Sequence, residues 1–174
     1  AMQPCVLWMD EIEKGLAGGD SSGDSTGAGK RMLGTLLTWM AERKSSVFLA
    51  ATANDIEALP PELMRKGRFD EIFFVDLPSQ AVRAGIFGIH LKKHRIACDD
   101  QALARPVAAS DGYSGAEIEA AIVGARYEAH GAGKPAEAAM VAAELARTRP
   151  LSVTRAEAIE ALRDWAAERT VSAD

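Results

Sequence analysis

Residues 5–11 read CVLWMDE, an uninterrupted apolar run that ends in two carboxylates. Apolar runs without alternation are typical of strands that are buried on both faces, as in a parallel sheet. The pattern recurs at residues 47–51, followed by TAN, and at residues 72–75, followed by DLP. Helix-like segments separate the three runs, and this alternation predicts an α/β fold with a parallel sheet.

The composition narrows the class of protein. The chain has 174 residues, of which 48% are hydrophobic, and this is enough apolar material for a packed core. The net charge of −5 gives no electrostatic footprint for nucleic acid, and no apolar run approaches membrane-spanning length. The two cysteines suit a reducing compartment, so we expect a cytoplasmic protein. Cys5 and Trp8 lie in the first apolar run and are predicted to be buried.

The chain changes character after Pro78. Alanine-rich helical segments follow, with helices expected at residues 79–94 and 136–147. We therefore predict two domains, half of an α/β domain at residues 1–78 and a helical domain at residues 79–174.

Two sequence patterns predict where further helices begin. Ser114 with Glu117, and Thr154 with Glu157, both have the spacing of a capping box, in which a hydroxyl and a carboxylate satisfy the first backbone N–H groups of a helix.

Asp10 and Glu11 stand where the first strand ends. Ligands bind beyond the carboxyl ends of strands in parallel α/β sheets. An aspartate there can hold Mg²⁺ through water, and a neighbouring glutamate can polarise an attacking water. The alternative is structural, because acidic residues also favour the N-terminus of a following helix.

Three further sets of residues carry possible chemistry. Asn54 follows the second strand, and its amide can bond both a water and a phosphate oxygen, or it can simply be a turn residue. Arg65 and Arg68 flank a glycine in a loop and suit recognition of a phosphate from another subunit, or a solvated basic turn. His90 and His94 are one helical turn apart and could share a metal, but the sequence offers no third ligand at a known spacing. The favoured prediction is a helix with one site histidine and one surface histidine.

In this order and spacing, the three strand ends and the arginine loop resemble the AAA ATPases, the group that includes the proteasomal ATPases and the membrane-anchored AAA proteases. Residues 5–11 look like the Walker B strand, with Asp10 on Mg²⁺ and Glu11 as the catalytic base. The resemblance makes Asn54 the sensor-1 residue and makes Arg65 and Arg68 a pair of arginine fingers.

The resemblance continues into the helical part. His90 falls where the family has a histidine near the nucleotide, and Gly115 and Ala116 fall where the sensor-2 backbone approaches it. The implied cofactors are ATP and Mg²⁺. The implied assembly is a ring of identical subunits, a hexamer, that remodels a protein or a macromolecular complex. The strings WMDEIEKG and LPPELMRKGRFDEIFFVDLP also resemble an uncharacterised AAA family first noted as a conserved reading frame of chloroplast genomes.

One departure from the family is large. The sequence has no phosphate-binding loop of the form GxxxxGK[ST]; the nearest string, DSTGAGKR at residues 24–31, has the wrong residues at both ends. The resemblance therefore implies the C-terminal half of a P-loop NTPase domain followed by its α-helical lid, a fragment inactive by itself. The strand that carries the loop would be missing. We expect the strands at 47–51 and 72–75 to pair directly, or another copy of the chain to cover the open edge.

Three functions follow from this reading. The first is an active ATPase, which needs all five polar groups at the strand ends and in the loop. The second is an AAA scaffold that binds nucleotide to assemble but does not hydrolyse it. The third is a helical adaptor, in which residues 79–174 bind a partner without nucleotide.

Overall fold

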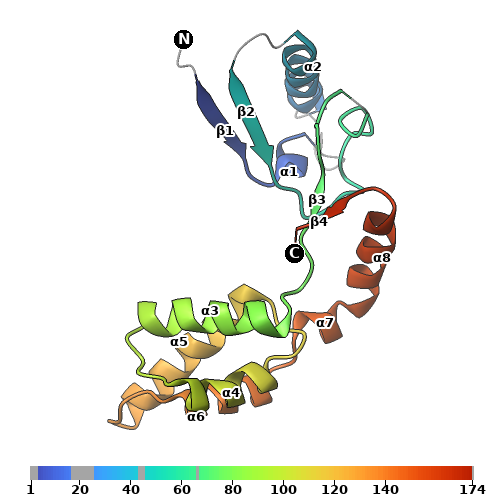
Figure 1. The fold of residues 1–174 in the computed structure, drawn as a ribbon. Helices are drawn as coiled ribbons and strands as arrows, with labels where there is room; N and C mark the ends of the chain where they lie inside the picture. The colour runs from blue at the N-terminus through green and yellow to red at the C-terminus, as the bar shows by residue number, and fades with distance from the viewer. Residues whose placement is uncertain (1–3, 17–25, 43–45, 66, 174) are drawn as a thin grey trace. The chain divides into compact units, whose positions relative to one another are not determined.

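The computed structural model describes residues 4–16, 26–42, 46–65 and 67–173 (Figure 1). The chain divides into two compact units, Ala1–Ile72 (unit 1) and Phe73–Asp174 (unit 2). Asp24 and Ser25 of the string at residues 24–31 lie outside the described residues, and its remainder opens a helix. No helix among the described residues is long and apolar enough to cross a membrane.

Unit 1 is built around two parallel strands, β1 (Cys5–Met9) and β2 (Val47–Ala51). Both strands have the predicted bounds, and their register pairs Cys5 with Val47 and Met9 with Ala51. Their carboxyl ends therefore lie side by side, as Figure 1 shows. Helix α1 (Ile12–Leu16) follows β1, and helix α2 (Thr26–Glu42) precedes β2.

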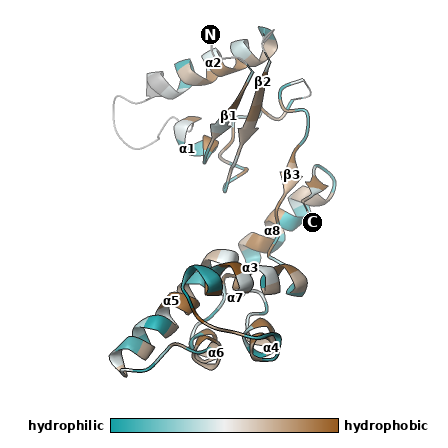
Figure 2. Cartoon of the chain, turned by 60° about the vertical axis from the view of Figure 1, so that its left-hand side comes forward, coloured by the Kyte–Doolittle hydropathy of each residue, from teal (hydrophilic) through white to brown (hydrophobic). Residues whose placement is uncertain are grey.

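The core of unit 1 is small. Its buried apolar residues come from α1, from α2 and from the loop after β2: Ile12, Leu16, Leu36 and Leu63. Side chains of β1 are largely exposed, and those of β2 are partly buried except for the exposed Phe48, although Figure 2 colours both strands as hydrophobic. The predicted burial of Cys5 and Trp8 is wrong, since Cys5 is exposed and Trp8 is 63% exposed. Among the described residues of unit 1, no second layer covers these side chains.

The third predicted strand has another partner than expected. It is shortened to β3 (Phe73–Phe74) and pairs in parallel with β4 (Val171–Ser172) near the end of the chain. The expected direct pairing with β2 is therefore wrong among the described residues. Because β3 shares its hydrogen bonds with β4, the division between the units falls after Ile72, ahead of the boundary expected at Pro78.

Unit 2 is a packed group of helices. Helices α3 (Gln80–Lys93), α4 (Asp100–Ala109), α5 (Gly115–Gly131) and α6 (Ala138–Arg147) enclose one core. The largest fully buried apolar side chains in it are Phe87, Ile118, Ile122, Val141 and Leu145. Helix α6 packs against both α4 and α5, so the segment between Gly131 and Pro150 supplies part of this core.

The two predicted capping boxes have different outcomes. Ser114 caps α5 as expected, with Glu117 bonding back to the Ser114 N–H at 2.8 Å. The second box is wrong. Thr154 instead ends the short helix α7 (Leu151–Thr154), where its hydroxyl donates to the Pro150 carbonyl, and α8 (Ala156–Ala167) begins after Arg155 without a side-chain cap.

Candidate functional site

Backbone hydrogen bonds hold the two strand ends of unit 1 together beyond the last strand residues. The Thr52 N–H donates to the Met9 carbonyl at 2.9 Å, and the Ile12 N–H donates to the Thr52 carbonyl at 2.9 Å. The chain therefore leaves β1 and β2 at paired positions, directly after Met9 and Ala51. This arrangement brings the side chains that follow β1 next to those that follow β2, as the parallel register requires.

The Glu11 carboxylate lies at the centre of this cluster. Its Oε1 accepts a hydrogen bond from Asn54 Nδ2 at 2.8 Å, and its Oε2 accepts one from Lys14 Nζ at 2.6 Å. The Glu11 backbone has a φ of 48°, a left-handed conformation that non-glycine residues seldom adopt and that is concentrated at functional sites. The hydrogen bond to Glu11 raises the pKa of the exposed Lys14 ammonium, against an opposing effect of burial.

Asp10 is tied to the same cluster through Thr52. The Thr52 hydroxyl donates to Asp10 Oδ1 at 2.5 Å and accepts from the Glu11 N–H at 2.9 Å. One threonine side chain therefore orients both acidic residues. The Asp10 side chain is otherwise exposed, so its carboxylate can face a hydrated cation.

Glu13 contributes a buried carboxylate directly beneath the cluster. Its side chain is only 4% exposed, and its Oε1 accepts the Asn54 backbone N–H at 3.2 Å. Its Oε2 has no hydrogen-bond partner among the described residues. Glu13 thus fixes the backbone of Asn54, while Glu11 contacts the Asn54 side chain.

The sequence reasoning missed Thr52, Glu13 and Lys14. The only signal for these three residues was that each lies within four positions of Asp10 or Asn54 in the sequence. Thr52 directly follows β2, and Glu13 and Lys14 lie in the first turn after β1, where a side chain points back toward the strand end.

The two arginines lie in the loop that precedes β3. Arg65 is exposed, and the Arg68 guanidinium donates a hydrogen bond to the Leu37 carbonyl of α2. Gly67 between them has a φ of 88°, which favours glycine. In the described part of unit 1, neither arginine is bonded to the carboxylates at the strand ends.

The remaining predicted site residues belong to unit 2. His90 lies on α3, and its Nδ1 is 3.2 Å from Glu119 Oε1 of α5. Gly115 and Ala116 form the first turn of α5, directly after the Ser114 cap.

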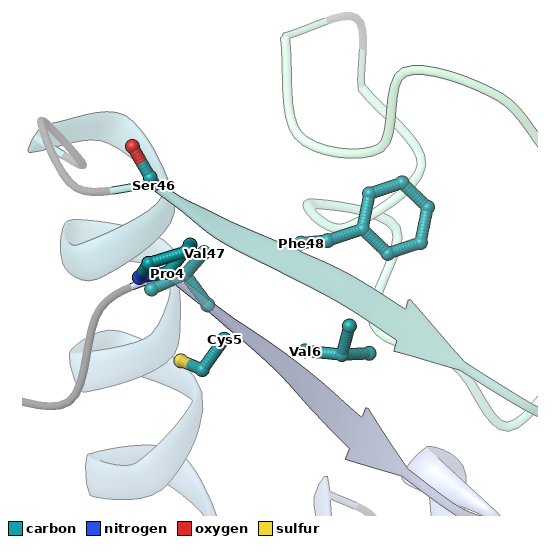
Figure 3. A pocket seen from close by; sticks show the side chains of 6 residues that line it. All are labelled: Pro4, Cys5, Val6, Ser46, Val47 and Phe48. Atoms are coloured by element: carbon teal, nitrogen blue, oxygen red, sulfur yellow. The ribbon is translucent and has the colours of Figure 1, made fainter.

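An open depression lies at the opposite end of the two strands from the polar cluster. Pro4, Cys5, Val6, Ser46, Val47 and Phe48 line it (Figure 3). All but one of these side chains lack a hydrogen-bonding oxygen or nitrogen. The depression offers no charged group to a nucleotide, and the polar cluster at the carboxyl ends is the candidate site.

Comparison with known proteins supports an assignment to a family. Residues 1–77 match the family model described as "ATPase family associated with various cellular activities (AAA)". The chain is 45% identical over 169 residues to "Uncharacterized AAA domain-containing protein ycf46" of Guillardia theta, covering 95% of this chain and 33% of that protein. The protein of the same name from Pyropia yezoensis is 41% identical over 168 residues, covering 96% of this chain and 34% of that protein. The chain thus spans about a third of the length of these relatives.

The fold also matches a solved structure. The FIGL-1 AAA domain in complex with ADP superposes with a TM-score of 0.73 at 19% identity, covering 95% of this chain and 57% of that one. The fold is therefore α/β and corresponds to the C-terminal half of an AAA domain. The family model and the relatives together show that the chain belongs to the AAA family.

Proposed function

We propose that the protein binds and hydrolyses ATP, as an AAA ATPase that remodels a protein or a macromolecular complex. The observation that carries the proposal is the Glu11–Asn54 contact of 2.8 Å at the carboxyl ends of two parallel strands. A carboxylate oriented by an amide can position and polarise an attacking water.

Asp10 suits a magnesium ion. Mg²⁺ prefers carboxylate oxygens and keeps most of its waters, and Asp10 offers an exposed carboxylate that Thr52 orients. When bound, the ion would neutralise negative charge on the phosphates. The contribution of the chain itself is to orient the Asp10 carboxylate and to fix the Glu11 backbone through the Thr52 hydroxyl.

The other site residues take supporting roles in the proposal. Arg65 and Arg68 would reach the nucleotide of a neighbouring subunit in a ring homo-oligomer, a hexamer. Arg65 is exposed and can do so directly, whereas Arg68 would have to leave the Leu37 carbonyl or act by holding the loop to α2. His90, Gly115 and Ala116 would contact the nucleotide from unit 2.

The phosphates themselves need a loop that these 174 residues do not contain. We therefore propose that sequence outside this chain supplies it, which fits a chain spanning about a third of its relatives. The chain alone is then expected to be inactive. A cytoplasmic location is part of the same proposal.

A second candidate is a scaffold that binds nucleotide without hydrolysing it. The Lys14 ammonium lies 2.6 Å from Glu11 Oε2, so both carboxylate oxygens are already engaged. If Lys14 keeps this contact when ATP is bound, the ammonium stabilises the ionised carboxylate and makes Glu11 a weaker base. The exposed position of Lys14 argues against a permanent contact, because surface ion pairs are weak.

The test uses the full-length protein with ATP and Mg²⁺. Glu11→Gln should abolish turnover while ATP binding persists, because the amide keeps the shape but cannot act as a base. Glu62→Gln, at an exposed glutamate of the same unit, is the matched control. Hydrolysis by Glu11→Gln at the parent rate would refute the role of Glu11. A parent protein that binds ATP but does not turn it over, and gains turnover as Lys14→Met, would favour the scaffold.

A further inference from the structure

Helices α3 and α5 bring two histidines and a glutamate together within unit 2. His90 and His94 lie on successive turns at the end of α3, and Glu119 faces them from α5. The three potential ligand atoms all lie within 4.8 Å of one another. The sequence showed the histidine pair but not Glu119, because the packing of α5 on α3 is a tertiary contact.

The separations are those of a metal site. Four ligands around a tetrahedral zinc ion at 2.0–2.1 Å lie about 3.3 Å apart. Glu119 Oε1 is 3.2 Å from His90 Nδ1 and 3.3 Å from His94 Nε2. Only the two imidazoles, whose ligand atoms lie within 4.8 Å of each other, would have to approach further.

One of these ligand atoms, His90 Nδ1, lacks a hydrogen-bond partner among the described residues. This nitrogen is buried, and Glu119 Oε1 is close by. A buried imidazole nitrogen without a partner is unfavourable. A cation held between this nitrogen and the carboxylate would satisfy both groups, and the other ring nitrogen of His90 stays outside the cluster.

The helices hold the ligands in place. Phe87 and Leu91 of α3 pack in the same buried core as Ile118 and Ile122 of α5, so the backbones that carry His90 and Glu119 are fixed relative to each other. Ligands on rigid elements are preorganised for a metal ion.

Two cations compete for the same groups. Lys93 Nζ lies 2.7 Å from Glu119 Oε1, and Arg126 donates to His94 Nδ1 at 3.0 Å. The Lys93 side chain is 60% exposed and can turn into solvent when another cation takes its place.

We propose that His90, His94 and Glu119 bind one divalent transition-metal ion of the zinc type, with the fourth position left to water. Two imidazoles and one carboxylate are a donor set that zinc favours. The site lies wholly within unit 2 and does not depend on ATP hydrolysis.

The test titrates Zn²⁺ by calorimetry, and Co²⁺ by visible absorption, into the metal-free chain without nucleotide. Both cysteines are replaced by serine in every protein, so that thiolates do not bind. We expect one site and the absorption of tetrahedral Co²⁺. His94→Ala and Glu119→Gln should each weaken binding by roughly tenfold or more, at least the loss seen when outer-shell partners are removed. His130→Gln, at an exposed histidine of α5, should change nothing.

A variant that binds Zn²⁺ more tightly is the second test, because misfolding can weaken binding but does not strengthen it. Lys93→Met removes the competing ammonium and should tighten binding about tenfold, the effect of a close like charge near a protein surface. No Zn²⁺ binding by either the parent or Lys93→Met would overturn the proposal. Equal affinity of the parent, His94→Ala and Glu119→Gln, each with unchanged helical circular dichroism, would do the same.

Discussion

Phe87, Ile118 and Val141 of unit 2 are 0% exposed, whereas Val6 and Phe48 of unit 1 are 68% and 69% exposed. Both groups come from apolar stretches of sequence. The helices of unit 2 find partners in one another, and their apolar faces form one core. The strands of unit 1 have α1, α2 and one another, and the described residues leave much of their apolar surface open. An apolar run therefore predicts a surface that is covered by other apolar groups. It does not predict that those groups belong to the same unit.

The largest expected effect on stability comes from comparing a buried phenylalanine of unit 2 with an exposed one of unit 1. Phe87→Ala should destabilise unit 2 by about 3–5 kcal/mol, because it opens a cavity in a closed core. Phe48→Ala should change stability by no more than about 0.5 kcal/mol, the usual range for exposed positions. Urea unfolding followed by circular dichroism measures both variants. Equal losses would mean that β2 is covered in solution, for example by a second copy of the chain.

A smaller effect is expected at Tyr113, whose hydroxyl closes the core of unit 2. The hydroxyl lies 2.6 Å from the Leu145 carbonyl and 2.8 Å from the Thr148 carbonyl, at the end of α6. Tyr113→Phe should cost about 0.5–1.5 kcal/mol, the net contribution of a buried hydrogen bond, because the Leu145 carbonyl keeps the Thr148 N–H as a donor. Tyr127→Phe, at a tyrosine that is 75% exposed, is the control and should be silent. A Tyr113→Phe protein as stable as its parent would show that water enters the end of α6.

The smallest effect should depend on pH. Arg163 of α8 binds Asp76 through two nitrogens, with Nε–Oδ2 and Nη2–Oδ1 distances of 2.9 Å each. Burial by itself would raise the pKa of the Asp76 carboxyl, but the hydrogen bonds from Arg163 and from the Leu77 N–H bring it below its usual value of 3.8. The stabilisation is therefore present above pH 3.8 and is lost as the pH falls through the lowered folded-state pKa.

Asp76→Asn measures that contribution. Both partners are partly exposed, so the loss at neutral pH should be about 1 kcal/mol or less. The difference between variant and parent should shrink once the pH is well below 3.8. Asp164→Asn, at an exposed aspartate of α8, is the control. A difference that stays constant down to that acidity would assign the effect to packing instead of charge.

Short sequence patterns correctly predicted the elements that depend on interactions between neighbouring residues. The strands Cys5–Met9 and Val47–Ala51 and the cap at Ser114 follow from a few neighbouring residues. The contact between Glu11 and Asn54 followed from the parallel pairing that those strands implied.

The failures have physical reasons. Thr154 had the right spacing for a cap, but its hydroxyl bonds the preceding Pro150 carbonyl and Arg155 interrupts the helix. Strand β4 has two residues, too few for any periodic pattern. Glu119 meets His90 only because two helices pack, and no spacing along the chain encodes that packing.

Position 11 combines two requirements that favour different residue types. A φ of 48° is a conformation that glycine or asparagine adopts at little cost, yet the proposed chemistry needs a long carboxylate at this position. Substitution by glycine would relax the turn and remove the proposed base. A gain in folding stability would then come with the loss of the proposed catalytic role, and selection for a more stable protein would act against that role.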